Sequence, residues 1–155
     1  MKKNRHRKLG FVLFVLYLVL LTYFLFFAEE MGRGSGASAE YRYNLTPLKE
    51  IRRFIVYRSV LGWRALILNI AGNVAAFLPF GFFLPEIWPQ VDKWYTTVLL
   101  SFLFSLLVET TQLITRVGSF DVDDLLLNTI GGLIGYAVFR AAKGVWNRYS
   151  ETNRK

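Results

Sequence analysis

Nine polar or charged side chains in this 155-residue chain lie within or beside apolar runs, and their types could bind ligands or do chemistry. They are Asn69, Asn73, Glu109, Gln112, Arg116, Asp121, Asp123, Asp124 and Asn128. A half-buried carboxylate can have a raised pKa and act as a general acid or base, while an arginine can hold an anionic headgroup. Carboxylate and amide oxygens are also ligands for Mg²⁺ or Ca²⁺, although the sequence DVDD defines no ligand geometry by itself. The sequence therefore identifies no cofactor and leaves a divalent cation open.

Composition excludes several other classes of site. The chain has no cysteine and one histidine, His6, so it contains no disulfide, no thiolate nucleophile and no multi-histidine zinc site. Its formal charge is +8, but 54% of its residues are hydrophobic and only 19% are charged. Much of the basic charge lies in two tails, 1–8 and 143–155, beside apolar segments. This placement favours a membrane protein over a nucleic-acid-binding protein.

Four apolar segments predict an all-α integral membrane protein. They lie at about 9–27, 65–84, 95–115 and 123–142. The first has no charged residue and is long enough to cross the hydrocarbon core as a helix. A cleaved signal peptide is the alternative, since residues 37–39 read ASA, but that site lies far beyond the apolar run. We therefore expect an uncleaved anchor.

Charge predicts the orientation of these spans. An even number of spans places both basic tails on one side, which the positive-inside rule makes cytoplasmic. The predicted location is thus the cytoplasmic (inner) membrane. The first loop, 28–64, is also basic. Residues 46–66, which begin in this loop and reach the start of the second span, have the pattern of an amphipathic helix at the membrane surface, with Tyr57 and Trp63 at headgroup depth.

Alternating spans place all nine polar residues in one leaflet. Asn69 and Asn73 open the second span, Glu109 and Gln112 close the third, and the aspartates open the fourth. Their spacings of three, four or seven residues give each helix one polar stripe. Charges in a membrane are costly, so the stripes should face protein or water. These patterns predict a polar chamber that opens toward the outer surface.

Structural explanations exist for most of these residues. The three aspartates follow a turn and open a helix, where capping and the helix dipole favour acids. The amides could bond between helices, and Gly131 and Gly135 have a helix-packing spacing. Glu109 lies inside an apolar run, and there function is the better interpretation.

Several segments in order resemble the VanZ-like family. They are NLTP at 44–47, NIAGNVAAFLPFGFFLP at 69–85, ETTQ at 109–112, Arg116, and DVDDLLLNTIGGLIGY at 121–136. The resemblance spans 44–136 and implies that 1–155 is a single domain of this family. It further implies a small bacterial membrane protein linked to teicoplanin resistance, with the polar residues above at the family's characteristic positions. It supplies no mechanism.

Three functions remain open. The first is a membrane protein whose outward-facing site engages an envelope lipid, a lipid-linked wall precursor or a lipoglycopeptide, and so alters sensitivity to teicoplanin. The second is an intramembrane enzyme that modifies a lipid-linked substrate with carboxylate or metal-assisted chemistry. The third is a small transporter or permeation subunit, which four spans without a visible inverted repeat favour least.

Overall fold

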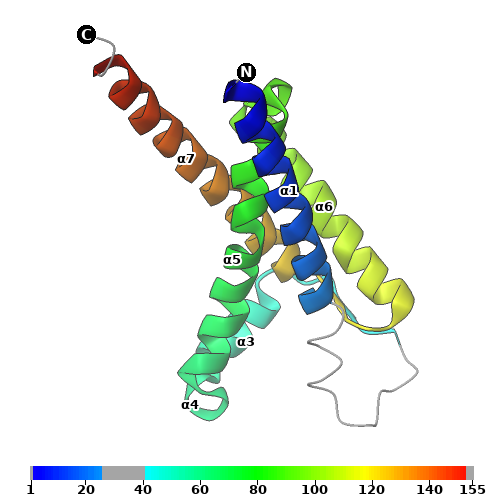
Figure 1. Ribbon diagram of the computed structural model, residues 1–155. Coiled ribbons are helices and arrows are strands. Elements are labelled where there is room, and N and C mark those ends of the chain that lie inside the picture. Colours follow the sequence, from blue (N-terminus) through cyan, green and yellow to red (C-terminus); the bar gives the residue numbers. More distant parts are fainter. Residues whose placement is uncertain (1, 26–40, 153–155) are drawn as a thin grey trace.

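The computed structural model describes residues 2–25 and 41–152, which form helices almost throughout (Figure 1). The helices are α1 (Lys2–Tyr23), α3 (Lys49–Val56), α4 (Arg58–Leu61), α5 (Trp63–Ile87), α6 (Trp94–Thr115) and α7 (Val122–Thr152), with a 3-10 turn η2 (Pro89–Val91). Two short strands, β1 (Tyr43–Asn44) and β2 (Phe120–Asp121), pair in parallel. The all-helical prediction is confirmed, and the strand pair is an addition that helical periodicity does not reveal.

Three helices of the described part are long and apolar enough to cross a membrane: Leu66–Ile87 within α5, Trp94–Thr115 (α6) and Val122–Thr152 (α7). They contain the predicted segments 95–115 and 123–142 and all but the first residue of 65–84. Large apolar side chains on them face outward, such as Leu68, which is 73% exposed, and Ile114, which is 68% exposed. Apolar surface of this extent indicates a multi-pass membrane protein.

The predicted first span is described only in part. Residues 9–23 belong to α1, and residues 26 and 27 lie outside the described part, as does the alternative cleavage site at 37–39. A fourth span is therefore not shown. The basic tails continue the helices as far as they are described, since α1 begins at Lys2 and α7 ends at Thr152.

Helix α5 is the centre of the fold, because α1, α6 and α7 all pack against it. Its contact with α7 depends on glycines. A Cβ at Gly131 would collide with the backbone carbonyl of Val74, and one at Gly135 would collide with that of Leu78. The missing side chains allow two apolar helices to approach at backbone distance, which strengthens their dispersion contacts.

An aromatic core joins α1 to α5 and α6. Phe14 of α1 lies 5.7 Å from Phe80 of α5 between ring centroids, and Phe80 stacks on Phe104 of α6 at 4.8 Å. Phe14 and Phe80 are buried, and Phe77 on the same face of α5 is fully buried. The Tyr17 hydroxyl donates to the Ala76 carbonyl at 2.7 Å. These contacts fix α1 beside α5.

Both termini lie at the same end of the molecule, and α3 and α4 lie near the other (Figure 1). At the terminal end, Arg7 donates to the Ile87 carbonyl at 2.8 Å and so covers the last turn of α5. Asp92 pairs there with Lys143 at 2.7 Å and Arg140 at 3.4 Å. Burial acts to raise the pKa of Asp92, but the bonds and charges of Lys143 and Arg140 outweigh it and hold the pKa below its ordinary value.

The segment predicted as one amphipathic helix over 46–66 is divided. Helix α3 ends at Val56, Tyr57 interrupts it, and α4 follows for one turn. Gly62 then turns the chain into α5 with a φ of 83°, a left-handed conformation that glycine adopts without steric cost. The amphipathic stretch is thus two short helices beside the start of α5.

Candidate functional site

Four carboxylates and two amides lie together at the end of the molecule that carries α3 and α4, where hydrogen bonds connect four of them and the adjacent Asp124 bonds to the sixth, Asn73. We name this group the carboxylate network, and its members are Asn44, Asn73, Glu109, Asp121, Asp123 and Asp124. They come from β1, α5, α6, β2 and α7, so five elements meet there.

Asp121 lies at the centre of the carboxylate network. Its backbone N–H donates to Oε2 of Glu109 at 2.9 Å, and its Oδ1 accepts from the backbone N–H of Asp123 at 2.8 Å. The second bond is an N-cap for α7, which begins one residue after Asp121. Asp121 therefore joins the end of α6 to the start of α7, as the capping interpretation of the sequence anticipates.

Asn44 attaches the first loop to this centre. Its Nδ2 donates to Oδ1 of Asp121 at 3.1 Å, while its Oδ1 accepts from the Thr46 N–H at 3.2 Å. The backbones pair as well, with Asn44 beside Asp121 in the parallel strands and the Phe120 N–H donating to the Arg42 carbonyl at 3.1 Å. Asn44 was not among the nine predicted site residues, although it opens the NLTP segment.

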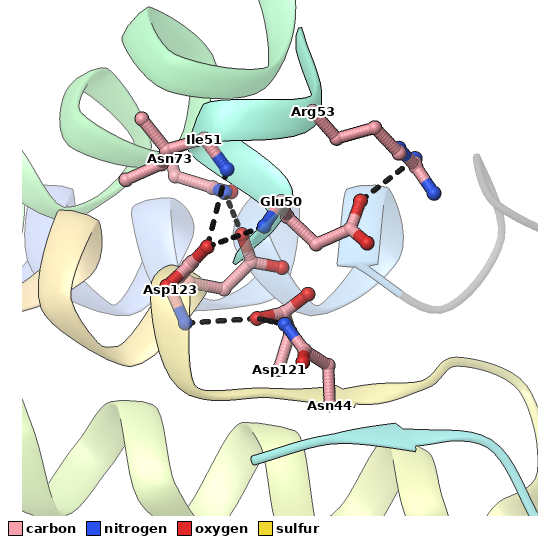
Figure 2. Close-up of polar contacts among 8 residues, drawn as sticks. Asn44, Glu50, Ile51, Arg53, Asn73, Asp121 and Asp123 are labelled. Atoms are coloured by element: carbon pink, nitrogen blue, oxygen red, sulfur yellow. Dashed lines mark hydrogen bonds and ion pairs between the residues drawn. The ribbon is translucent and has the colours of Figure 1, made fainter. Parts of the chain in front are cut away.

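Asp123 caps a helix other than its own. It is 1% exposed, and its Oδ2 accepts from the backbone N–H groups of Glu50 at 2.8 Å and Ile51 at 3.1 Å (Figure 2). Its Oδ1 accepts from the N–H of Leu48, which has a left-handed φ of 63°. A carboxylate at these donors satisfies the first turn of α3 and complements its dipole. Capping thus explains Asp123, with α3 instead of α7 as the capped helix.

Asp124 holds the other neighbouring helix. Its Oδ1 accepts from Nδ2 of Asn73, which lies on α5. Consecutive residues at the start of α7 therefore point in different directions, Asp123 toward α3 and Asp124 toward α5.

The other predicted site residues lie near the carboxylate network with separate partners. Gln112 donates to the Leu25 carbonyl at 3.1 Å, and Asn128 donates to the Ser105 hydroxyl at 2.9 Å. Arg116, which ends α6 in a left-handed conformation with φ of 59°, lies 4.6 Å from the ring centroid of Tyr41. Asn69 is half-buried one turn before Asn73, and its side chain bonds to no described residue.

A polar stripe on α6 escaped the sequence analysis. Thr97, Ser101 and Ser105 are fully buried at four-residue spacing, and Glu109 continues the series. The stripe faces α7, because a Cβ at Gly132 would collide with the Ser101 hydroxyl. Small hydroxyl residues repeating every fourth position in an apolar helix were the signal that could have found it.

No predicted site residue lines the hollow of about 780 Å³ at this end of the molecule. Its walls come from residues 46–57, with Leu48, Ile55 and Tyr57 among them, so it lies along α3. The predicted polar chamber stays a prediction, while the structure shows a surface hollow beside the helix that Asp123 caps.

Electrostatics set Asp121 apart. Burial raises its pKa above the ordinary value, and the charges of Asp123 and Glu50 add to this effect, while the bonds from the Asp123 N–H and Asn44 oppose it. Within residues 2–25 and 41–152, no three acidic or histidine side chains are arranged to hold a metal ion. Outside the spanning helices, the pKa of Asp121 is raised and that of Asp92 is lowered, so Asp121 is the one of the two whose surroundings favour the protonated acid.

Comparison with known proteins gives one finding. The family model described as VanZ/LLP1 matches residues 14–143, which include α5, α6 and the carboxylate network. No curated protein and no solved structure matches the chain.

Proposed function

The chain belongs to the VanZ/LLP1 family, and from this premise we propose that it alters the sensitivity of the bacterial envelope to teicoplanin and related lipoglycopeptides. It does so by engaging an envelope lipid, a lipid-linked wall precursor or the drug. The teicoplanin link rests on the family name, and the site of engagement on the geometry described above.

The observation that carries the proposal is the position and bonding of the carboxylate network. Its members lie near the end that carries α3 and α4. Asp123 holds α3 against α7, and Asn44 holds β1 against β2. Their oxygens bind the protein's own backbone and amides, which is the arrangement expected of groups that shape a binding surface. Under this proposal α1 is a fourth span, both termini are cytoplasmic, and the carboxylate network faces outward.

One observation favours a second function. The raised pKa of Asp121 is what an acid-base residue of a lipid-modifying enzyme would need. Replacing Asp121 by Asn and, in a second variant, Glu109 by Gln, followed by mass spectrometry of the envelope lipids, tests this alternative. An enzyme requires at least one lipid species to change with either variant.

The main proposal is tested by expression in a teicoplanin-susceptible bacterium. Wild type is compared with D123N, which weakens the cap on α3, and with D92N as a matched aspartate change at the other end of the molecule. We expect wild type and D92N to shift the inhibitory concentration of teicoplanin and D123N to shift it less. A glycopeptide without a fatty-acyl chain serves as the drug control. Unchanged teicoplanin sensitivity at confirmed membrane expression of the wild type would refute the proposal.

A further inference from the structure

The segment that Asp123 holds in place is strongly basic. Residues 41–64 contain six basic residues and one acidic residue, Glu50. The basic residues are Arg42, Lys49, Arg52, Arg53, Arg58 and Arg64. Under the proposed topology this charge lies on the side that the positive-inside rule leaves poor in basic residues. Topology alone therefore does not account for it.

Helix α3 has an inner and an outer face. Glu50, Ile51 and Phe54 are half-buried toward α5 and α7. The outer face has a basic edge, where Lys49 and Arg53 are four residues apart, and an apolar edge with Ile55, which is 45% exposed.

Exposed apolar side chains also occur just before α3, at its last residue and in α4. Leu48 is 58% exposed, Val56 is 57% exposed and Val60 is 82% exposed. Side chains of this size in contact with water would be costly, whereas the boundary between headgroups and acyl chains accommodates them. The outer face thus combines basic charge with exposed apolar side chains, which are the two properties of a surface that lies in an anionic leaflet.

Much of the positive charge on this face has no counter-charge among residues 2–25 and 41–152. Arg53 pairs with Glu50 at 2.7 Å, and Figure 2 shows the pair extending away from Asp121 and Asp123. Lys49 and Arg52 form no ion pair with any residue in the described part of the chain. The hollow along α3 is lined by Lys49, Arg52 and Arg53 together with Leu48 and Ile55. An anionic group with an attached acyl chain matches this lining in both charge and polarity.

We propose that the outer face of α3 and α4 binds the phosphate headgroups of anionic phospholipids in the leaflet at this end of the molecule. Three of the six basic residues line the hollow, while Arg42, Arg58 and Arg64 lie outside its lining. Positive charge that extends beyond one site suits a leaflet of many headgroups better than a single diphosphate. Because Asp123 ties α3 to α7, the bound leaflet also fixes the height of the carboxylate network in the membrane. This inference concerns a separate surface and does not depend on the teicoplanin role.

Trp63, at the start of α5, provides a local probe. It is 62% exposed and lies 5.8 Å from the Arg58 guanidinium, beside the outer face. Replacing Trp88, Trp94 and Trp146 by Phe leaves Trp63 as the one tryptophan of the full chain. This protein is reconstituted in two kinds of phosphatidylcholine vesicle. One contains brominated phosphatidylglycerol, and the other contains brominated phosphatidylcholine at the same mole fraction. Bromine quenches only tryptophan in contact with it. The quenching of Trp63 by brominated phosphatidylglycerol, divided by that by brominated phosphatidylcholine, therefore measures local enrichment of the anionic lipid.

We expect brominated phosphatidylglycerol to quench Trp63 more strongly than brominated phosphatidylcholine, with a local excess on the order of five-fold at low salt. The excess should shrink as salt screens the charges. In the double variant Lys49→Gln and Arg52→Gln the ratio should fall toward one, and this variant retains the Glu50–Arg53 pair.

A matched control removes two basic side chains from the terminal end. Lys8 and Arg148 are exposed there and form no ion pair with a described residue, so K8Q/R148Q should keep the wild-type ratio. Circular dichroism is used to check that all variants are equally helical. Equal quenching by the two lipids in wild type would overturn the proposal, as would an unchanged ratio in K49Q/R52Q. Displacement of phosphatidylglycerol by a polyprenyl phosphate at equal mole fraction would also overturn it, in favour of a lipid-linked precursor.

Discussion

Asp123 shows how one residue serves two helices. It belongs to the first turn of α7, yet its carboxylate accepts the backbone N–H groups of Leu48, Glu50 and Ile51. A fully buried carboxylate needs such donors, since burial without them costs several kcal/mol. The charge is thus part of the architecture that holds the first loop against the spans.

Replacing Asp123 by Asn should lower the free energy of unfolding by about 2–3 kcal/mol, because charge-assisted bonds weaken and the new NH₂ group faces backbone donors. The measurement is unfolding in mixed micelles, followed by circular dichroism. D124N is the matched control and should cost less, since its partner on α5 is the side-chain amide of Asn73, which can rotate to pair with another amide. Equal stability of D123N and wild type would contradict the capping role.

Asp121 predicts a particular dependence on pH. Burial raises its pKa in the folded protein above the ordinary value of 3.8. A raised pKa means that its stabilising contribution is fully present below the ordinary value and is lost as the pH rises through the folded value. The asparagine side chain in D121N does not titrate. The free energy of unfolding of wild type, minus that of D121N, should therefore decrease as the pH rises from 3.8.

The test is a pH series of unfolding free energies for wild type and D121N in the same detergent. The difference between the two should level off once Asp121 is ionised in the folded protein. A difference that does not change with pH, or that grows with it, would show that the environment of Asp121 does not disfavour its charge.

Among the elements, α5 and α7 form the closest pair. Gly131 and Gly135 bring α7 against the backbone of α5 at Val74 and Leu78. By contrast, a Cβ at Gly144, farther along α7, would meet no atom within 4 Å. The helix thus offers a test position and a control of the same residue type.

Gly131→Ala should destabilise the protein by ~1–3 kcal/mol, because the added methyl group forces α5 and α7 apart. Gly144→Ala should instead be neutral or stabilising by up to ~1 kcal/mol, because alanine has the higher helix propensity. Both are measured by unfolding in mixed micelles. Equal changes in the free energy of unfolding for the two substitutions would contradict the role of Gly131 in allowing α5 and α7 to approach closely.

The sequence predicted the long helices well and their contacts less well. Hydropathy located α5, α6 and the first part of α7, but it did not detect that α7 continues to Thr152, because that stretch is polar. The apolar segment 123–142 placed Asp123 at the start of the last span and could not reveal its partners in the first loop, 72 to 75 residues earlier. The pairing of Asn44 with Asp121 could not be predicted either, because a strand of two residues is too short to show a periodic pattern.

For the whole molecule, the position of the termini leads to a topology prediction. The chain has no cysteine, so single cysteines can be introduced at exposed positions without a background. Ser59→Cys on α4 should react with a membrane-impermeant maleimide in intact cells, and Asn147→Cys on α7 should react only after the membrane is opened. Labelling of both residues in intact cells, or of neither, would contradict four spans with cytoplasmic termini.

The bond between Asp123 and α3 has a consequence for biogenesis. Asp123 lies 75 residues after Leu48, so α3 leaves the ribosome long before the carboxylate that caps it. Until α7 is inserted, the first-turn N–H groups of α3 have only water or lipid headgroups as partners, and an eight-residue helix is marginal without its cap. The first loop therefore reaches its final form last, and a chain that stops before residue 123 leaves this end of the protein unassembled.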